Sequence, residues 1–457
     1  MNSDLKGEKM KIVIAPQNSR QTMEGWGTSL CWWANTIGKW TNQEKMNEIC
    51  DLLFDAEKGL GMNIVRYNIG GGENPPNLAN LREGANIPCY LDECNQWNWE
   101  VDRGQRKILK IALSKGADIA EVFSNAPPFH MTRNGSTSGA DDRKNNLKED
   151  QYKAFADFLT EVVKHFKEEW DISFRTLSIF NEPISMWWYN ANNQEGCYFD
   201  TDHQIRILKS VIESFKEKGI KETTLSAPEG WSVFDSIYSY GVYSEDIKKF
   251  ISQINTHAYF GDDYSRRVMR SVAKEEGKKL WMSEVSCGGT EQHNHEDMTG
   301  AVELANSICN YINGMGAEAW VYWQAVENED LKLNHGLIHA NFNGEETYWL
   351  TKQYFVFANF SRFIRRGAVI IDCGNKEIVA AVDEKARTLT VVAVNGSGQE
   401  RELSFELSGM KVMDGAVEAI RTSVDENLSR IAEYHIDKGT LKVTLKGISV
   451  TTLLIRF

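Results

Sequence analysis

Short apolar runs alternate with longer stretches of helical spacing from residue 25 to residue 362. This order is typical of repeated β-α units, in which helices cover a parallel sheet. Eight runs predict strands, at residues 25–30, 62–67, 118–124, 174–180, 224–227, 250–256, 279–283 and 317–323. A doubly wound open sheet is the rival arrangement, but no Gly-x-Gly-x-x-Gly sequence follows the first run. The pattern therefore predicts a (β/α)8 TIM barrel with long loops.

The pattern changes after Arg366, where short alternating segments are bounded by turns. These segments are residues 377–382, 388–394, 402–407, 432–436, 441–445 and 449–457. They predict a small antiparallel β-sandwich. Residues 11–15 predict a further strand ahead of the barrel. We expect three parts: an N-terminal segment at 1–20 whose strand joins the β domain, the barrel at 21–364 and a β-sandwich side domain at 365–457.

The composition is that of a globular protein with a large core, since 42% of the 457 residues are hydrophobic and 25% are charged. A formal net charge of −13 and the lack of a Lys/Arg block argue against a nucleic-acid partner. No run reaches the ~18 apolar residues of a membrane helix, so no membrane span is expected. The chain as given lacks a signal-peptide pattern, which predicts a cytoplasmic location, or secretion if a signal peptide was removed.

The eight cysteines show neither a Cys-x-x-Cys pair nor histidines at zinc spacing. We expect reduced thiols, although Cys89 and Cys94 are close enough along the chain for a loop disulfide. The sequence shows no cluster of metal ligands and no Gly-x-Ser-x-Gly elbow, so it predicts neither a metal site nor a serine hydrolase.

Two of the predicted strands run into glutamates. The run at 174–180 is followed by Asn181-Glu182-Pro183, and the run at 279–283 is followed by Glu284. The carboxyl ends of parallel barrel strands open on one mouth, so both carboxyl groups are expected to face one pocket. Such a pair can cleave glycosidic bonds, with retention at a separation of about 5 to 5.5 Å and inversion at about 6.5 to 9.5 Å. A structural salt bridge is the alternative for each glutamate.

Other strand ends carry polar or aromatic residues that we expect to contact the substrate: Arg66, Asn125, Asn181, Glu229, Trp231, His257, Tyr259, Trp323 and Trp32. Arg66 is expected to hold a carboxylate ionised, the alternative being an ion pair elsewhere in the core. Asn181 could bond a sugar 2-hydroxyl. Glu229 could bind a sugar hydroxyl or join a salt bridge.

Tyr259 could hydrogen-bond the nucleophile and His257 could contact the sugar, although either could equally be a satisfied core residue. Trp323, Trp32 and Trp231 are the tryptophans expected to offer flat apolar faces to sugar rings.

Together these motifs resemble glycoside hydrolase family 30 of clan A. The resemblance covers nearly the whole chain, in segments that follow the family's order: 25–34, 63–72, 123–128, 180–183, 256–259, 282–284 and 322–324. It implies a retaining β-glycosidase that needs no cofactor, with Glu182 as the acid/base and Glu284 as the nucleophile. The positions that surround the reacting sugar in such enzymes correspond to Arg66, Asn181, His257, Tyr259 and Trp323.

The substrate implied by the resemblance is a β-1,6-linked galactan or galacto-oligosaccharide. Residues 27–34 and the stretch that begins Arg66-Tyr-Asn-Ile-Gly-Gly are similar to the endo-β-1,6-galactanase branch, with Phe129-His130 where that branch has an aromatic pair. The alternatives within the family are β-glucosidase or glucosylceramidase-type, β-1,6-glucanase, xylanase and galactofuranosidase activity. The alternative of another class is a non-catalytic carbohydrate-binding protein. Exo or endo action and the oligomeric state stay open.

Overall fold

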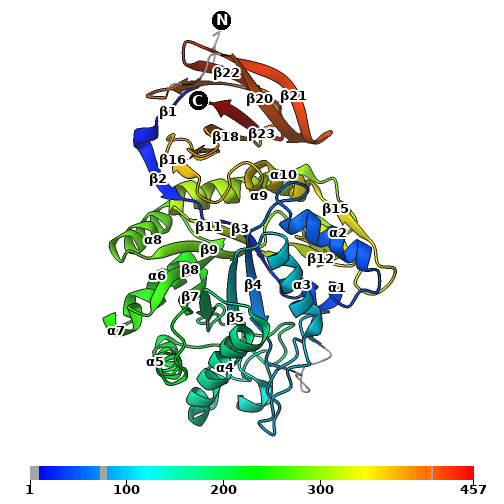
Figure 1. The fold of residues 1–457 in the computed structure, drawn as a ribbon, viewed down its shortest axis with the longest axis vertical. Coiled ribbons are helices and arrows are strands. Elements are labelled where there is room, and N and C mark those ends of the chain that lie inside the picture. Colours follow the sequence, from blue (N-terminus) through cyan, green and yellow to red (C-terminus); the bar gives the residue numbers. More distant parts are fainter. Residues whose placement is uncertain (1–9, 73–79, 411, 413–414) are drawn as a thin grey trace, which may run out of the picture.

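The computed structural model describes residues 10–72, 80–410, 412 and 415–457. Eight parallel strands close into a barrel in the order β11-β3-β4-β5-β6-β7-β8-β9 (Figure 1). They are β3 (Gly25–Ser29), β4 (Ile64–Ile69), β5 (Ile119–Ser124), β6 (Thr176–Ser178), β7 (Thr224–Ser232), β8 (Ile251–Phe260), β9 (Lys279–Val285) and β11 (Ala319–Gln324). All eight predicted runs form strands, and barrel closure confirms the TIM barrel over the doubly wound sheet. β6 is shorter than predicted, whereas β7 and β8 run further.

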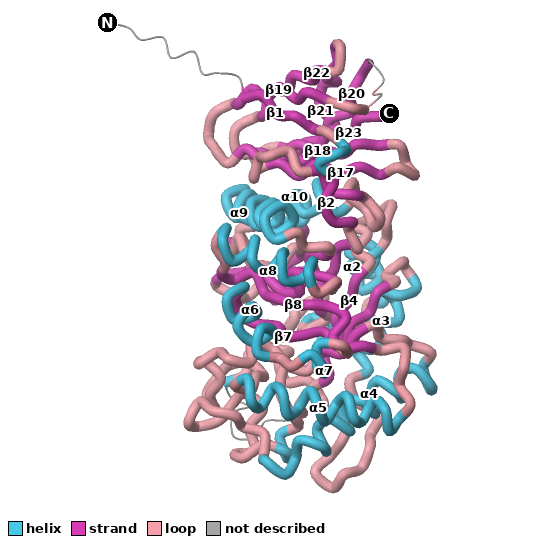
Figure 2. Tube along the Cα trace, turned by 90° about the vertical axis from the view of Figure 1, so that its left-hand side faces the viewer, coloured by secondary structure: helices cyan, strands magenta, loops and turns pink. Residues whose placement is uncertain are grey.

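Helices surround the barrel (Figures 1 and 2). They are α1 (Trp33–Ile37), α2 (Gln43–Phe54), α3 (Arg103–Ser114), α4 (Tyr152–Trp170), α5 (Thr201–Lys218), α6 (Val233–Val242), α7 (Glu245–Lys248), α8 (Asp263–Glu275), α9 (Met298–Cys309) and α10 (Lys352–Ser361). In α4, Phe155, Leu159, Val162 and Phe166 recur every three or four residues and are buried, which places one apolar face on the barrel. None of the helices in the described ranges is long and apolar enough to cross a bilayer.

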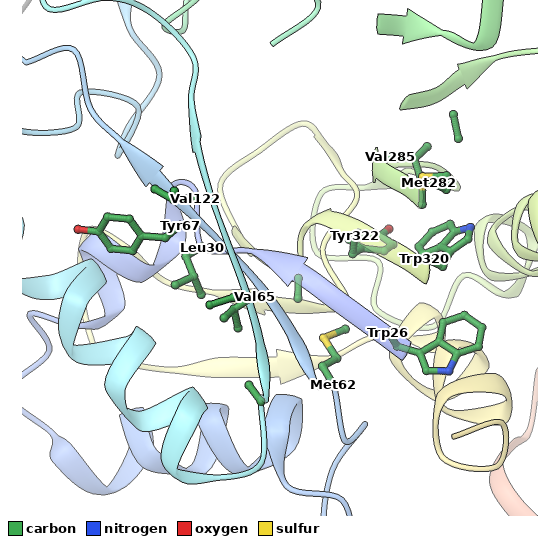
Figure 3. Close-up of a cluster of buried hydrophobic side chains, with 14 of the residues drawn as sticks. Trp26, Leu30, Met62, Val65, Tyr67, Val122, Met282, Val285, Trp320 and Tyr322 are labelled. Carbon is green, nitrogen blue, oxygen red and sulfur yellow. The ribbon is translucent and has the colours of Figure 1, made fainter. Parts of the chain in front are cut away.

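Side chains alternate between the two faces of each barrel strand. Val65 and Tyr67 of β4 belong to the large buried cluster between strands and helices, as does Met282 of β9 (Figure 3). The intervening residues face the barrel axis, where a small apolar cluster forms from Ile64, Ile119, Trp281, Ala319 and Val321. Arg66 and Glu121 come two residues further along β4 and β5 on the same inward face, so a charged layer follows the apolar one.

A second, ten-stranded sheet folds into two layers (Figures 1 and 2). In sheet order they are β1 (Met10–Ile14), β19 (Arg401–Leu407), β22 (Thr440–Leu445), β21 (Glu426–Asp437), β20 (Gly415–Ser423), β23 (Ser449–Arg456), β18 (Thr388–Asn395), β17 (Ile378–Asp383), β16 (Val369–Ile371) and β2 (Ser19–Thr22). A separate apolar cluster lies between the layers. β1 pairs with β19, so a strand that precedes the barrel completes this sheet.

The sheet packs on the barrel through α9 and α10, which lie between the two (Figure 2). Asn359 of α10 donates to Thr452 Oγ1 at 2.9 Å, and that hydroxyl donates to the Asn359 carbonyl at 2.9 Å. Residues 1–9 lie outside the described residues, and the domain limits at 20 and 364 stay predictions.

Short strands in the loops after β9 and β11 complete the structure: β10 (Thr290–Glu291) with β13 (Leu333–Asn334), and β12 (Val326–Asn328) with β14 (Ile338–Ala340) and β15 (Tyr348–Leu350). A π-helical segment at Asn310–Met315 continues α9.

Candidate active site

A cavity of about 610 Å³ opens at the carboxyl ends of the barrel strands. The predicted site residues on its wall are Glu182, Trp231, Tyr259, Glu284 and Trp323. They follow or end β6, β7, β8, β9 and β11, so barrel closure brings together residues that lie far apart in the sequence.

Glu182 and Glu284 face one another in this cavity. A carboxylate oxygen of each lies within 4.8 Å of the other and of a His257 ring nitrogen. The strand before Glu182 is shorter than the predicted run of 174–180. β6 already ends at Ser178, so Glu182 lies in the loop that follows the strand. Its backbone has a left-handed φ of 48° and its N–H donates to the Glu229 carbonyl at 2.8 Å, which anchors this turn to β7.

The two carboxylates have different neighbours. Glu182 Oε2 accepts from the Trp187 indole N–H at 3.2 Å, and His257 Nδ1 lies 3.1 Å from Glu182 Oε1. Glu284 accepts from the Tyr259 hydroxyl at 3.3 Å and from Arg66 Nη1 at 3.4 Å. The structure thus places Arg66 and Tyr259 beside Glu284.

Arg66 belongs to a fully buried layer beneath the pair. Its Nε donates to Glu121 at 2.7 Å and its Nη2 donates to Glu229 at 2.6 Å, and none of the three side chains is exposed to solvent. Asn255 donates to both glutamates, at 3.0 Å to Glu121 Oε1 and 2.7 Å to Glu229 Oε1. Such full pairing is what allows charges to remain inside a barrel.

The other predicted binding residues lie behind the cavity wall: Arg66, Asn125, Asn181, Glu229, His257 and Trp32. Glu229 lies within β7 with no exposed surface and forms a salt bridge with Arg66, which is the second of the two roles that the sequence left open. Asn125 is buried with its amide 3.7 Å from the Cys31 sulfur, and Trp32 meets Trp323 edge-on at 5.2 Å. Asn181 is also buried, and its Oδ1 has no partner among the described residues.

Comparison with known proteins identifies the family. The sequence model of O-Glycosyl hydrolase family 30 matches residues 9–274. The chain belongs to this family. The match confirms the resemblance seen in the motifs, and with it an O-glycosyl hydrolase as the kind of enzyme.

Two relatives and one solved structure are also similar to the chain. The chain is 29% identical to an endo-beta-1,6-galactanase of Hypocrea rufa, over 87% of this chain and 83% of that protein. It is 25% identical to an exo-beta-1,6-galactobiohydrolase of Bifidobacterium longum, over 72% of this chain and 28% of that protein. A conserved exported protein of Bacteroides fragilis has the same fold, with a TM-score of 0.81 and 24% identity over 97% of this chain and 99% of that one.

The charges in this family 30 site are strongly coupled. Burial disfavours the Glu229 carboxylate, but Arg66 and then His257 outweigh it and lower the pKa of Glu229 to about 2. Burial likewise disfavours a charged His257, yet Glu284, Glu182 and Glu229 raise the pKa of His257 to about 10. His257 is therefore an imidazolium at neutral pH and lies between three carboxyl groups.

Burial acts on the Glu284 carboxyl group against its two cationic neighbours. Burial raises the pKa of Glu284 to about 7; His257 and Arg66 act against this shift, whereas Glu182 adds to it. Because Glu182 and Glu284 lie so close, this proton belongs to the pair and can move between them. The pair thus offers one acid and one carboxylate near neutral pH.

The atoms of Glu182, His257 and Glu284 also have a spacing that could hold a metal ion. The Arg66 guanidinium lies 3.4 Å from Glu284, so one member of this group already has a cationic partner.

Several residues of the site were missed by sequence reasoning. Glu121 carried a signal, since an acidic residue within an apolar strand must find a buried partner. Trp187 follows Glu182 closely, but its contact depends on the fold of the intervening loop. Arg82 reaches the cavity from the segment between β4 and α3 and Glu327 from β12, and neither carried a recognisable pattern.

Proposed function

We propose that this family 30 protein is a retaining β-glycoside hydrolase that cleaves β-1,6-linked galactan or galacto-oligosaccharides. The carboxylate pair carries the proposal, since its oxygens approach within 4.8 Å. That separation suits direct attack by one carboxylate, at about 5 to 5.5 Å, better than the about 6.5 to 9.5 Å that leaves room for a water. The galactan substrate rests on the names of the relatives from Hypocrea rufa and Bifidobacterium longum.

In this proposal Glu284 attacks the anomeric carbon and Glu182 protonates the leaving oxygen. Donation from Arg66 and Tyr259 favours the ionised form of Glu284, which drives the shared proton toward Glu182. Glu182 then activates the water that hydrolyses the glycosyl-enzyme. Trp323 and Trp231 offer apolar faces to the sugar rings. No cofactor takes part.

The pH profile tests the shared proton. Below a pH of about 7 the pair keeps its proton, and above it the proton is lost, because burial raises the pKa of Glu284 to about 7. Loss of the proton removes the acid, so kcat/KM should fall about tenfold per pH unit above that point. The measurement is kcat/KM against pH on a galactobioside with a poor leaving group. A rate that keeps rising above about pH 8 would contradict a shared proton as the catalytic acid.

A panel of substrates tests which sugar the protein cleaves. We expect release of galactose or galactobiose from β-1,6-galactobiose, longer β-1,6-galacto-oligosaccharides and nitrophenyl β-galactosides. Chromatography of the released sugars is the measurement. Gluco-, xylo- and galactofurano-configured substrates of equal length are the matched controls. Faster cleavage of any of these would move the proposal to the corresponding alternative, and binding without cleavage of any substrate would favour a carbohydrate-binding protein.

A further inference from the structure

A second cavity of about 650 Å³ adjoins the catalytic one. Tyr259, Ser286, Leu333 and His335 line both cavities, so the two lie side by side. We call the second cavity the side cleft. Beyond the shared residues, it is defined by the end of β8, the loop after β9 and α9 with its π-helical extension, including Phe260, Glu303, Asn306 and Asn310.

Aromatic rings lead from the catalytic cavity to the side cleft. Trp231 and Tyr259, both on the catalytic wall, have ring planes 12° apart and centroids 6.3 Å apart. Phe260, which lines the side cleft, lies 6.5 Å from Trp231 with planes 8° apart, and Phe234 flanks it at 5.9 Å. Phe260 is 56% exposed. Nearly parallel rings with an open face match the flat apolar face of a sugar ring.

Polar side chains form the opposite wall of the side cleft. Glu303, Asn306 and Asn310 follow one another at intervals of three and four residues, so they lie on one face of α9 and its extension. The Glu303 carboxylate can accept hydrogen bonds from hydroxyl groups, and the two amides can both donate to and accept from them. Within the described ranges, no side-chain hydrogen bond or ion pair occupies these three groups.

We propose that the side cleft is a glycan-binding subsite, which holds sugar units of a long chain whose cleaved bond lies in the catalytic cavity. The inference rests on the proposed function and extends it from the reacting sugar to the length of the substrate. An aromatic platform facing polar groups is the chemistry that recognises a carbohydrate. The position of the side cleft next to the catalytic cavity favours another part of the same glycan chain as its occupant. A substrate that spans both cavities has sugar units beyond the reacting one, so chain length should control affinity.

The test compares substrates of increasing length. For wild-type protein, kcat/KM should rise with the length of the β-1,6-galacto-oligosaccharide until the chain reaches the side cleft. Phe260→Ala should lower the ratio of kcat/KM on a long oligosaccharide to that on a nitrophenyl galactoside by about tenfold, the equivalent of 1.4 kcal/mol. Asn310→Ala should lower the same ratio less. It serves as a second variant because it leaves the aromatic rings unchanged. Tyr264→Ala is the matched control, because Tyr264 is a 65% exposed aromatic residue that lines neither cavity.

A ratio that stays at the wild-type value in both variants would overturn the inference, as would a wild-type kcat/KM independent of chain length.

Failure of the proposed function would give different results from failure of the side cleft. If another β-linked series is cleaved instead, the length ratio is measured on that series, and the side cleft is judged there. If no series is cleaved, retardation of the wild type by galactan in affinity electrophoresis, lost in Phe260→Ala but kept in Tyr264→Ala, would support the side cleft alone. No difference between these proteins would refute it.

Discussion

Glu284→Ala is expected to lower kcat/KM by on the order of 10⁵-fold, because it removes the proposed nucleophile from a pair that acts as a unit. The cavity left behind is bordered by Arg66 and Tyr259, which now donate to Glu284 and can hold a small anion in its place. Azide should therefore restore part of the rate with an activated galactoside, and the product should be a glycosyl azide of inverted configuration. Product configuration by NMR is the measurement.

Glu182→Ala is the matched control for this assignment. This variant should turn over substrates with good leaving groups faster than Glu284→Ala does. Azide should give a product of retained configuration, because the glycosyl-enzyme still forms on Glu284. Exchanged outcomes for the two variants would reverse the roles of Glu182 and Glu284. Wild-type rates in both would remove the pair from catalysis altogether.

Arg66→Ala is expected to destabilise the fold by about 3 to 5 kcal/mol, because it leaves the buried Glu121 and Glu229 without their cation. The effect should appear as a lower midpoint of denaturant unfolding. The activity of the folded fraction should fall as well, since Arg66 also donates to Glu284. Arg66→Lys should recover only part of the stability, since one ammonium cannot reproduce the bonds from Nε and Nη2.

The control for Arg66 is an exposed ion pair. Arg206 lies 2.8 Å from Glu149, and the two side chains are 49% and 69% exposed. Arg206→Ala should leave the unfolding midpoint almost unchanged, since solvent screens such pairs. Equal midpoints for Arg66→Ala and the wild type would show that the buried layer is not held together by this cation.

Most of the barrel could be predicted because its signals are local. The strand at 279–283 can be recognised from its own apolar residues, and the glutamate that follows it is equally apparent in the sequence. Strand ends were less predictable. β6 already stops at Ser178, and the segment after it is held by the bond from the Glu182 N–H to the Glu229 carbonyl of β7, which is distant in the sequence.

The sequence by itself determined the strand pattern, the two glutamates at strand ends and the arginine that had to find a carboxylate, because periodicity and burial cost act along the chain. The tertiary structure decided which groups meet. Arg66 bonds Glu121, Glu229 and Glu284 across 55, 163 and 218 positions of sequence, and only barrel closure sets those distances. For the same reason Glu229 lies in the buried layer rather than on the cavity wall, and the side cleft beside Tyr259 is visible only in the folded protein.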